Sequence, residues 1–146
     1  MMSGLGFWSL VAIAVAAAGG GSAQGGGEAG STDAVGATGS ARAFSLEQLM
    51  AERQASGREW LEFLRVESLS MGVYHLKKGA TDTQSPHRQD EVYYVATGRA
   101  VLAVDGRDYP VEPGSVVFVK ANAKHRFHSI IEDLTTLVFF APAETE

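Results

Sequence analysis

Residues 91–119 read EVYYVATGRAVLAVDGRDYPVEPGSVVFV. Short runs of Val, Leu, Tyr and Phe alternate there with turn signals, which is typical of strands rather than helices. The turn signals are Thr97-Gly98, Asp105-Gly106 and Pro113-Gly114. Asp105-Gly106 is the strongest hairpin signal, because it is flanked by alternating apolar residues and both residue types tolerate the positive φ of a two-residue turn. The region therefore predicts short strands joined by tight turns.

The same two-residue period extends to both sides of this region. Seven or eight short strands, spaced by roughly 8–12 residues, indicate a sandwich or barrel. The expected strands are Trp60–Val66, Leu69–Lys77, Glu91–Ala96, Ala100–Val104, Asp108–Val111, Val116–Val119, His125–Ile130 and Thr135–Ala141. The sequence thus predicts an all-β protein.

One short helix is expected before the first strand. Ser45 is a candidate N-cap, and Gln48 three residues later completes a capping-box pattern. Apolar residues recur at helical spacing from Leu46, so the helix is expected to run through about Gln54. Gly57 is expected to end it.

Composition excludes several classes of function. Lys and Arg total 12 and Asp and Glu total 17, a formal net charge of −5, which argues against a nucleic-acid-binding surface. The chain has no cysteine, which excludes disulfides, thiolate metal sites and a Cys nucleophile. No apolar run reaches the roughly 18–20 residues of a membrane span.

The N-terminal residues 1–23 have the features of a signal peptide. The apolar stretch Phe7–Ala18 has the length of a signal-peptide core, and Gly21-Ser22-Ala23 offers small residues for cleavage. No Lys or Arg precedes the apolar stretch, which is unusual for a signal peptide. The alternative is a start codon assigned too early. The protein would be secreted or periplasmic in the first case and cytoplasmic in the second.

The rest of the chain divides by composition. Residues 24–43 are rich in Gly, Ala and Ser and are expected to be disordered, because they carry too few large apolar side chains to offset the entropy of ordering. Residues 44–141 are expected to form the barrel. Residues 142–146 remain as a C-terminal tail.

Two imidazoles and one carboxylate are the candidate metal ligands. His87 and Glu91 are four residues apart, and His125 follows Glu91 by 34 residues. This donor set suits Fe, Mn, Zn, Ni or Cu, and three protein ligands leave positions open for water or substrate. Residues four apart in a straight strand lie about 13 Å from one another, too far for one ion. Either the pair lies on a helix or the chain bends between them, and the polar residues 85–90, which include a proline, favour a bend.

Side-chain parity adds residues to this set. Tyr93 shares a strand face with Glu91 and is therefore a candidate for the substrate pocket. Phe127 shares a face with His125, whereas His128 points the opposite way and is expected at the surface. The sequence does not indicate whether His75 points into the barrel or away from it. Spacing identifies no second acid–base pair near the site.

Two groups of motifs resemble those of the cupin superfamily, in particular its small single-domain members. The first group is Gly79, Ser85-Pro86-His87, Glu91 and Gly98, and the second is Gly106, Pro113–Val119 and His125-Arg126-Phe127. The resemblance covers about residues 60–140. It implies an RmlC-like double-stranded β-helix, which is a jelly-roll barrel.

The resemblance also implies a metal inside the barrel, with His87, Glu91 and His125 as its ligands. Ser85 departs from the family pattern, which has a His two residues before the one at position 87. The departure leaves three ligands instead of four. Ser85 or the nearby Gln84 would then hold a metal-bound water, so both belong to the expected substrate pocket. Phe118 and Phe127 are expected to fill the barrel and make this pocket apolar.

Three functions remain open at this point. The first is a metal-dependent enzyme of dioxygenase or isomerase type that acts on a small organic molecule. The second is a non-catalytic module that binds a metal or small ligand, and the third is a metal-free structural barrel. A homodimer is expected for a barrel this small, with the strand Trp60–Val66 as a candidate contact.

Overall fold

The computed structural model describes residues 40–84 and 86–145, and residues 41–146 form one compact unit. Within these described residues, one helix is followed by eight strands. Their bounds are α1 Leu46–Ser56, β1 Trp60–Val66, β2 Leu69–Leu76, β3 Asp90–Thr97, β4 Ala100–Val104, β5 Arg107–Val111, β6 Val116–Val119, β7 His125–His128 and β8 Leu134–Ala141. No helix in this part of the chain is long and apolar enough to cross a membrane.

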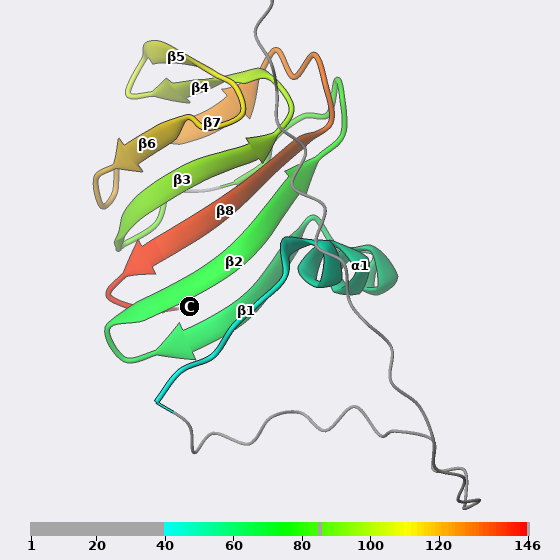
Figure 1. The fold of residues 1–146 in the computed structure, drawn as a ribbon. Helices are drawn as coiled ribbons and strands as arrows, with labels where there is room; N and C mark the ends of the chain where they lie inside the picture. The colour runs from blue at the N-terminus through cyan, green and yellow to red at the C-terminus, as the bar shows by residue number, and fades with distance from the viewer. Residues whose placement is uncertain (1–39, 85, 146) are drawn as a thin grey trace, which may run out of the picture. The chain divides into compact units, whose positions relative to one another are not determined.

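The strands form two antiparallel sheets (Figure 1). The larger sheet has the order β1-β2-β8-β3-β6, and the smaller has the order β5-β4-β7. The C-terminal strand β8 lies between β2 and β3, so the middle of the larger sheet is completed only by the end of the chain. The fold is a double-stranded β-helix, or jelly roll, with one short helix against β1 and β2.

The hydrophobic core lies between the two sheets. Tyr93 and Val138 from the larger sheet and Leu102 and Phe127 from the smaller one are each at most 1% exposed. The rings of Tyr93 and Phe127 meet edge to face, with centroids 5.2 Å apart. Such an aromatic pair adds about 0.5–1.5 kcal/mol to the free energy gained from burial. The alternating sequence pattern therefore places one face of each sheet in the core.

The expected strands are confirmed, with bounds that shift by one or two residues at five of them. The largest shift is in β7, which ends at His128 instead of Ile130, because Ser129 adopts a positive φ of 49° and breaks the strand. At the Asp105-Gly106 hairpin both residues have positive φ, 47° and 81°, as the turn requires.

The predicted capping box of the helix is wrong. Ser45 is the N-cap residue, but its side chain makes no capping hydrogen bond. The Ser45 carbonyl instead accepts the first helical bond, from the Leu49 amide at 3.0 Å. The predicted C-terminus is confirmed, since Gly57 follows the last helical residue in the left-handed conformation.

Three expectations lie mostly or wholly outside the described residues. These are the signal peptide at 1–23, the disordered segment at 24–43 and the role of Ser85. Strand β1 is an edge of the larger sheet, so one side of Trp60–Val66 has no strand partner in the described chain. The homodimer through this strand stays a prediction, which a mass measurement by light scattering would check.

Gly98 is expected to be the least replaceable of the turn glycines. Its φ is 87°, and a Cβ there would lie 2.3 Å from the Asp133 carbonyl oxygen. Gly98→Ala should therefore cost about 3 kcal/mol of unfolding free energy, from the strained φ and the backbone clash together. Gly79→Ala is the matched control, because Gly79 also has a positive φ but a Cβ there would meet nothing within 4 Å. Equal urea midpoints for the two variants would contradict the role given to the contact between Gly98 and the Asp133 backbone.

Candidate metal centre

The first half of the site is formed where the chain enters β3. A bend at Arg88 and Gln89 separates His87 from Glu91, the second residue of the strand. The sequence left a helix or a bend open, and the structure shows the bend. It brings ligand atoms of His87, Glu91 and His125 within 4.8 Å of one another.

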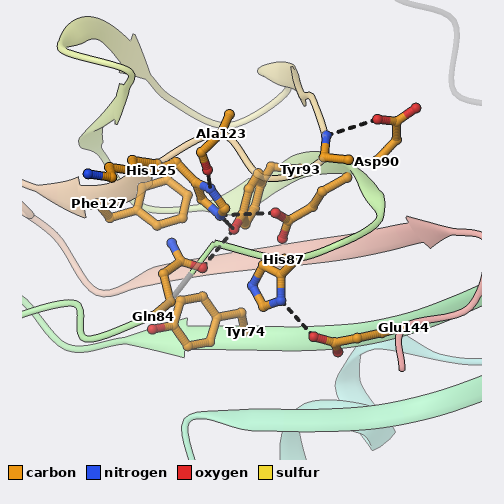
Figure 2. A network of polar contacts seen from close by, with 12 residues as sticks. Tyr74, Gln84, His87, Asp90, Tyr93, Ala123, His125, Phe127 and Glu144 are labelled. Atoms are coloured by element: carbon orange, nitrogen blue, oxygen red, sulfur yellow. Dashed lines mark hydrogen bonds and ion pairs between the residues drawn. The ribbon is translucent and has the colours of Figure 1, made fainter. Parts of the chain in front are cut away.

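The second half comes from β7 on the opposite sheet. Nδ1 of His125 lies 2.9 Å from the carbonyl oxygen of Ala123, which can only accept a hydrogen bond. Nδ1 therefore carries a proton, and Nε2 is the nitrogen that faces the site. Nε2 lies 3.0 Å from Oε2 of Glu91 and 3.2 Å from the Tyr93 hydroxyl (Figure 2).

The His87 ring is oriented like that of His125, with Nδ1 facing an oxygen acceptor. Nδ1 of His87 lies 2.6 Å from Oε1 of Glu144, and Figure 2 shows the other ring nitrogen on the side away from Glu144. The ring packs 4.8 Å from that of Phe140 and 5.6 Å from that of His125. Each histidine thus has Nδ1 occupied by an acceptor and Nε2 available to a ligand.

The electrostatics of the site fit a cation. Glu91 is 2% exposed, and its Oε2 has no hydrogen-bond partner among the described residues apart from the close contact with His125. A buried carboxylate is costly unless it is paired. Burial alone would lower the pKa of His125, but hydrogen bonds to Glu91 and Ala123 and the nearby negative charges raise it overall. Two imidazoles and a carboxylate that share one buried volume are a donor set suited to a divalent transition metal.

A chain of hydrogen bonds leads away from the ligands to a second buried carboxylate, Asp82. The Tyr93 hydroxyl donates to Oε1 of Gln84 at 2.8 Å, and Nε2 of Gln84 donates to Asp82 at 2.8 Å. Burial is the main cause that raises the pKa of Tyr93, and the negative charge of Glu91 raises it further, so the phenol stays protonated. Tyr93 is therefore the donor to Gln84, and Gln84 is the donor to Asp82. The Tyr93 oxygen can still accept a hydrogen bond from a group in the site.

Asp82 ties the segment before His87 to the barrel. It is 6% exposed and accepts hydrogen bonds from the Tyr74 hydroxyl at 2.7 Å and the Phe127 amide at 2.7 Å, in addition to those from Gln84. Burial and the hydrogen bond to Asp82 raise the pKa of Tyr74 far above its usual range. The carboxylate thus joins β2, β7 and the segment that carries Gln84.

A cavity of about 170 Å³ opens beside the ligands. At about 30 Å³ per water this is room for about six waters, which suits a molecule smaller than a drug-sized ligand. The cavity has aromatic and aliphatic walls and a polar end. Its lining comprises Trp60, Tyr74, Gln84, His87, Glu91, Tyr93, Val138, Phe140 and Glu144.

The structure places most of the predicted site residues together. His87, Glu91, Tyr93 and Gln84 line the cavity, and His125 contacts Glu91 and Tyr93. Phe127 fills the core against Tyr93, outside the cavity lining. Ser85 lies outside the described residues.

The prediction for Phe118 is wrong. Its side chain is 60% exposed, because Phe118 pairs with Val92 on the outer face of the larger sheet. Its neighbours Val117 and Val119 point toward the core instead. The run Val116–Val119 contains no polar residue, so its sequence does not show which face is buried.

The other two histidines lie away from the site. His128 is at the surface, as expected, where its Nε2 lies 3.1 Å from Asp108. His75 lies on the outer face of the larger sheet, paired with Thr135, and its Nδ1 is 3.0 Å from the Thr135 hydroxyl. Burial, with Arg53 and Lys77 nearby, lowers the pKa of His75.

Sequence reasoning missed six residues of the site, namely Trp60, Tyr74, Asp82, Val138, Phe140 and Glu144. Trp60 and Tyr74 are cross-strand neighbours that point inward, so their parity could have indicated them. Asp82 and Glu144 lie in segments without strand periodicity, where no sequence signal gives the direction of a side chain.

A small jelly-roll barrel with two histidines and one glutamate at its centre is the architecture of a cupin domain. Residues 72–140 match the family model of the cupin domain. An uncharacterized protein of Streptomyces coelicolor is 49% identical over 104 residues, which cover 71% of this chain and 99% of that protein. The chain belongs to the cupin family.

Solved structures with this fold come from proteins of varied description. KdgF from Halomonas sp. has a TM-score of 0.51 and 18% identity, over 60% of this chain and 88% of that one. An RmlC-like cupin from Methanocaldococcus jannaschii has a TM-score of 0.52 and 17% identity, over 57% and 78%. The DMSP lyase DddQ from Ruegeria pomeroyi has a TM-score of 0.50 and 22% identity, over 52% of this chain and only 39% of the lyase. At these identities the likeness establishes the fold and does not select an activity.

Asp82→Asn is expected to lower the free energy of unfolding by about 2–4 kcal/mol. The carboxylate accepts hydrogen bonds from Tyr74, Gln84 and the Phe127 amide, and the NH2 group of an asparagine would face one or more of these donors without being able to accept from them. Asp108→Asn is the matched control, since the Asp108 side chain is 62% exposed and its carboxylate has His128 as its one polar partner among the described residues. Urea unfolding of both variants measures the difference. Equal stability would contradict the role given to Asp82.

Proposed function

We propose that this protein binds one divalent transition-metal ion through His87, Glu91 and His125, and that the adjoining cavity takes a small organic molecule. The observation that carries the proposal is the convergence of the three donors within 4.8 Å of one another around the buried carboxylate of Glu91, whose Oε2 has only the His125 imidazole, at 3.0 Å, as a polar partner among the described residues. Fe, Mn, Zn, Ni and Cu all suit this donor set.

The arrangement suits a reactive site better than a structural one. Three protein ligands leave coordination positions open, whereas structural zinc sites use four. When bound, such an ion supplies Lewis-acid chemistry and, if it is iron or copper, redox chemistry. Trp60 and Phe140, with ring centroids 6.0 Å apart, offer an apolar wall to the body of a ligand.

The proposed activity is of dioxygenase or isomerase type, and one observation favours it. Glu144 is a carboxylate that lines the cavity without being one of the three ligands, and because its Oε1 meets Nδ1 of His87 at 2.6 Å, its other oxygen is the one that would exchange a proton. A carboxylate that is not consumed by the metal is what proton transfer to or from a substrate requires.

A second candidate, a non-catalytic module that holds a metal or small ligand, is favoured by a different observation. The Tyr93 hydroxyl donates a hydrogen bond to Oε1 of Gln84, and Nε2 of Gln84 donates one to Asp82. Two of the polar groups that line the cavity are thus engaged with one another. Turnover of small phenols, diketones or sugars would favour the enzyme, and tight binding without turnover would favour the module.

Purified protein loaded with a divalent metal is expected to hold about one ion per chain after dialysis. His87→Ala should lower the affinity for the ion more than about 100-fold, because the loss of a ligand exceeds the 10–100-fold cost of losing an outer partner. His128→Ala is the matched control, since that ring contacts Asp108 at the surface. Elemental analysis gives the metal content. Absence of metal from the parent chain, or equal content in the parent and His87→Ala, would overturn the proposal.

Metal affinity is also expected to fall as the pH is lowered. The pKa of His125 is raised above its usual value, so below that pKa a proton occupies the ring and competes with the ion. The affinity should decrease by up to about tenfold per pH unit below this pKa and level off above it. Zinc competition titrations at a series of pH values measure the slope. An affinity independent of pH would exclude His125 as a ligand.

A further inference from the structure

Residues 142–145, which follow β8, form a strap beside the metal centre. We call residues 142–145 the C-terminal strap. It leaves the end of β8 and is attached at several points to β1, β2, the turn between them and the segment before β3. The contacts are, donor first, Glu144 N to Ser70 Oγ at 2.9 Å, Ala143 N to Glu67 O at 3.4 Å, Gln89 Nε2 to Thr145 Oγ1 at 2.9 Å, and the Arg65 guanidinium to the Glu144 carbonyl.

These attachments use the backbone of Glu144 and leave its side chain directed into the site. Oε1 of Glu144 lies 2.6 Å from Nδ1 of His87, across 57 positions of sequence. Both side chains are largely buried, with 22% of His87 and 25% of Glu144 exposed. A pair with this burial is less screened by solvent than an ordinary surface ion pair.

The contact gives His87 the arrangement that Ala123 gives His125. In both rings Nδ1 faces an oxygen acceptor, which leaves Nε2 for the ion. For His125 the acceptor is a backbone carbonyl two residues away, held by the barrel itself. For His87 the acceptor is a carboxylate on the strap. Carboxylates in this position fix the tautomer and the orientation of the ligand ring.

We propose that Glu144 of the C-terminal strap is a positioning residue of the metal centre, and that ion binding at His87 and docking of the strap stabilise one another. The inference rests on the proposed metal site. If Glu144 strengthens metal binding by holding the His87 ring, the ion must strengthen docking of the strap by the same factor, because coupling between two binding events is reciprocal.

The strap also contributes to the wall of the cavity, because Glu144 is part of its lining. A small molecule in the cavity would therefore contact the same side chain that orients His87.

The test is a zinc titration of the full chain against a chromophoric chelator. Glu144→Ala is expected to lower zinc affinity by about 10–100-fold, the usual cost of losing an outer partner of a histidine ligand. Glu144→Gln should fall between Glu144→Ala and the parent, because the amide oxygen still accepts from Nδ1 but carries no charge. Glu67→Gln, an exposed carboxylate in the turn beside the strap, removes the same charge and should leave the affinity unchanged.

Hydrogen exchange of the Glu144 amide distinguishes a positioning role of Glu144 from a purely structural one, because only a positioning role makes this exchange depend on zinc. Zinc should slow exchange of the Glu144 amide, which donates to Ser70, in the parent chain. The same addition should not slow exchange in Glu144→Ala, while its thermal unfolding without metal should stay cooperative.

The outcomes separate the two proposals. Zinc binding by the parent with unchanged affinity in both Glu144 variants would overturn the positioning role and leave the metal site standing. Failure of the parent to bind zinc or any of the other divalent ions would overturn both. If Glu144→Ala does not fold, Glu144→Gln decides, and parent-like affinity together with parent-like slowing by zinc would overturn the inference.

Discussion

A buried carboxylate between two sheets is the constraint around which this structure is organised. Glu91 on β3 faces His125 on β7 at 3.0 Å, and both side chains are at most 2% exposed. An ionised carboxylate at that depth requires a positive partner, and the residues that surround it are arranged to supply one. The same contact links the larger sheet to the smaller one, so the chemistry of the site and the closure of the barrel depend on the same residues.

A second buried carboxylate, that of Asp82, determines how His87 reaches Glu91 and His125. The segment between β2 and β3 has no strand to pair with, yet it must carry His87 to the barrel centre. Asp82 holds it there through hydrogen bonds to Tyr74 on β2 and to the Phe127 amide on β7. Its bonds with Gln84 continue to Tyr93, whose hydroxyl lies 3.2 Å from His125. The loop is therefore ordered by buried polar contacts, which are specific because each missing partner is costly.

The donor set and the cavity constrain function more tightly than the fold does. Cupin barrels of similar shape occur in proteins of different description, so the fold alone does not select a reaction. In this chain the cavity combines an aromatic wall, a three-donor centre and the carboxylate of Glu144. A small ligand with an apolar body and an oxygen donor would meet both ends of that space.

The sequence by itself determined the strands, the turns and the candidate ligands, because side-chain alternation and turn chemistry are local properties. Parity alone placed Tyr93 beside Glu91, and the polar segment before Glu91 indicated the bend that brings His87 back. Only the tertiary structure decided that Phe118 faces outward, since the run Val116–Val119 is apolar on both faces. It also decided that Glu144 meets His87, because that contact joins residues 57 positions apart and depends on the insertion of β8 between β2 and β3. Long-range pairing of this kind has no periodic signal in sequence, whereas it follows directly once the sheet order is known.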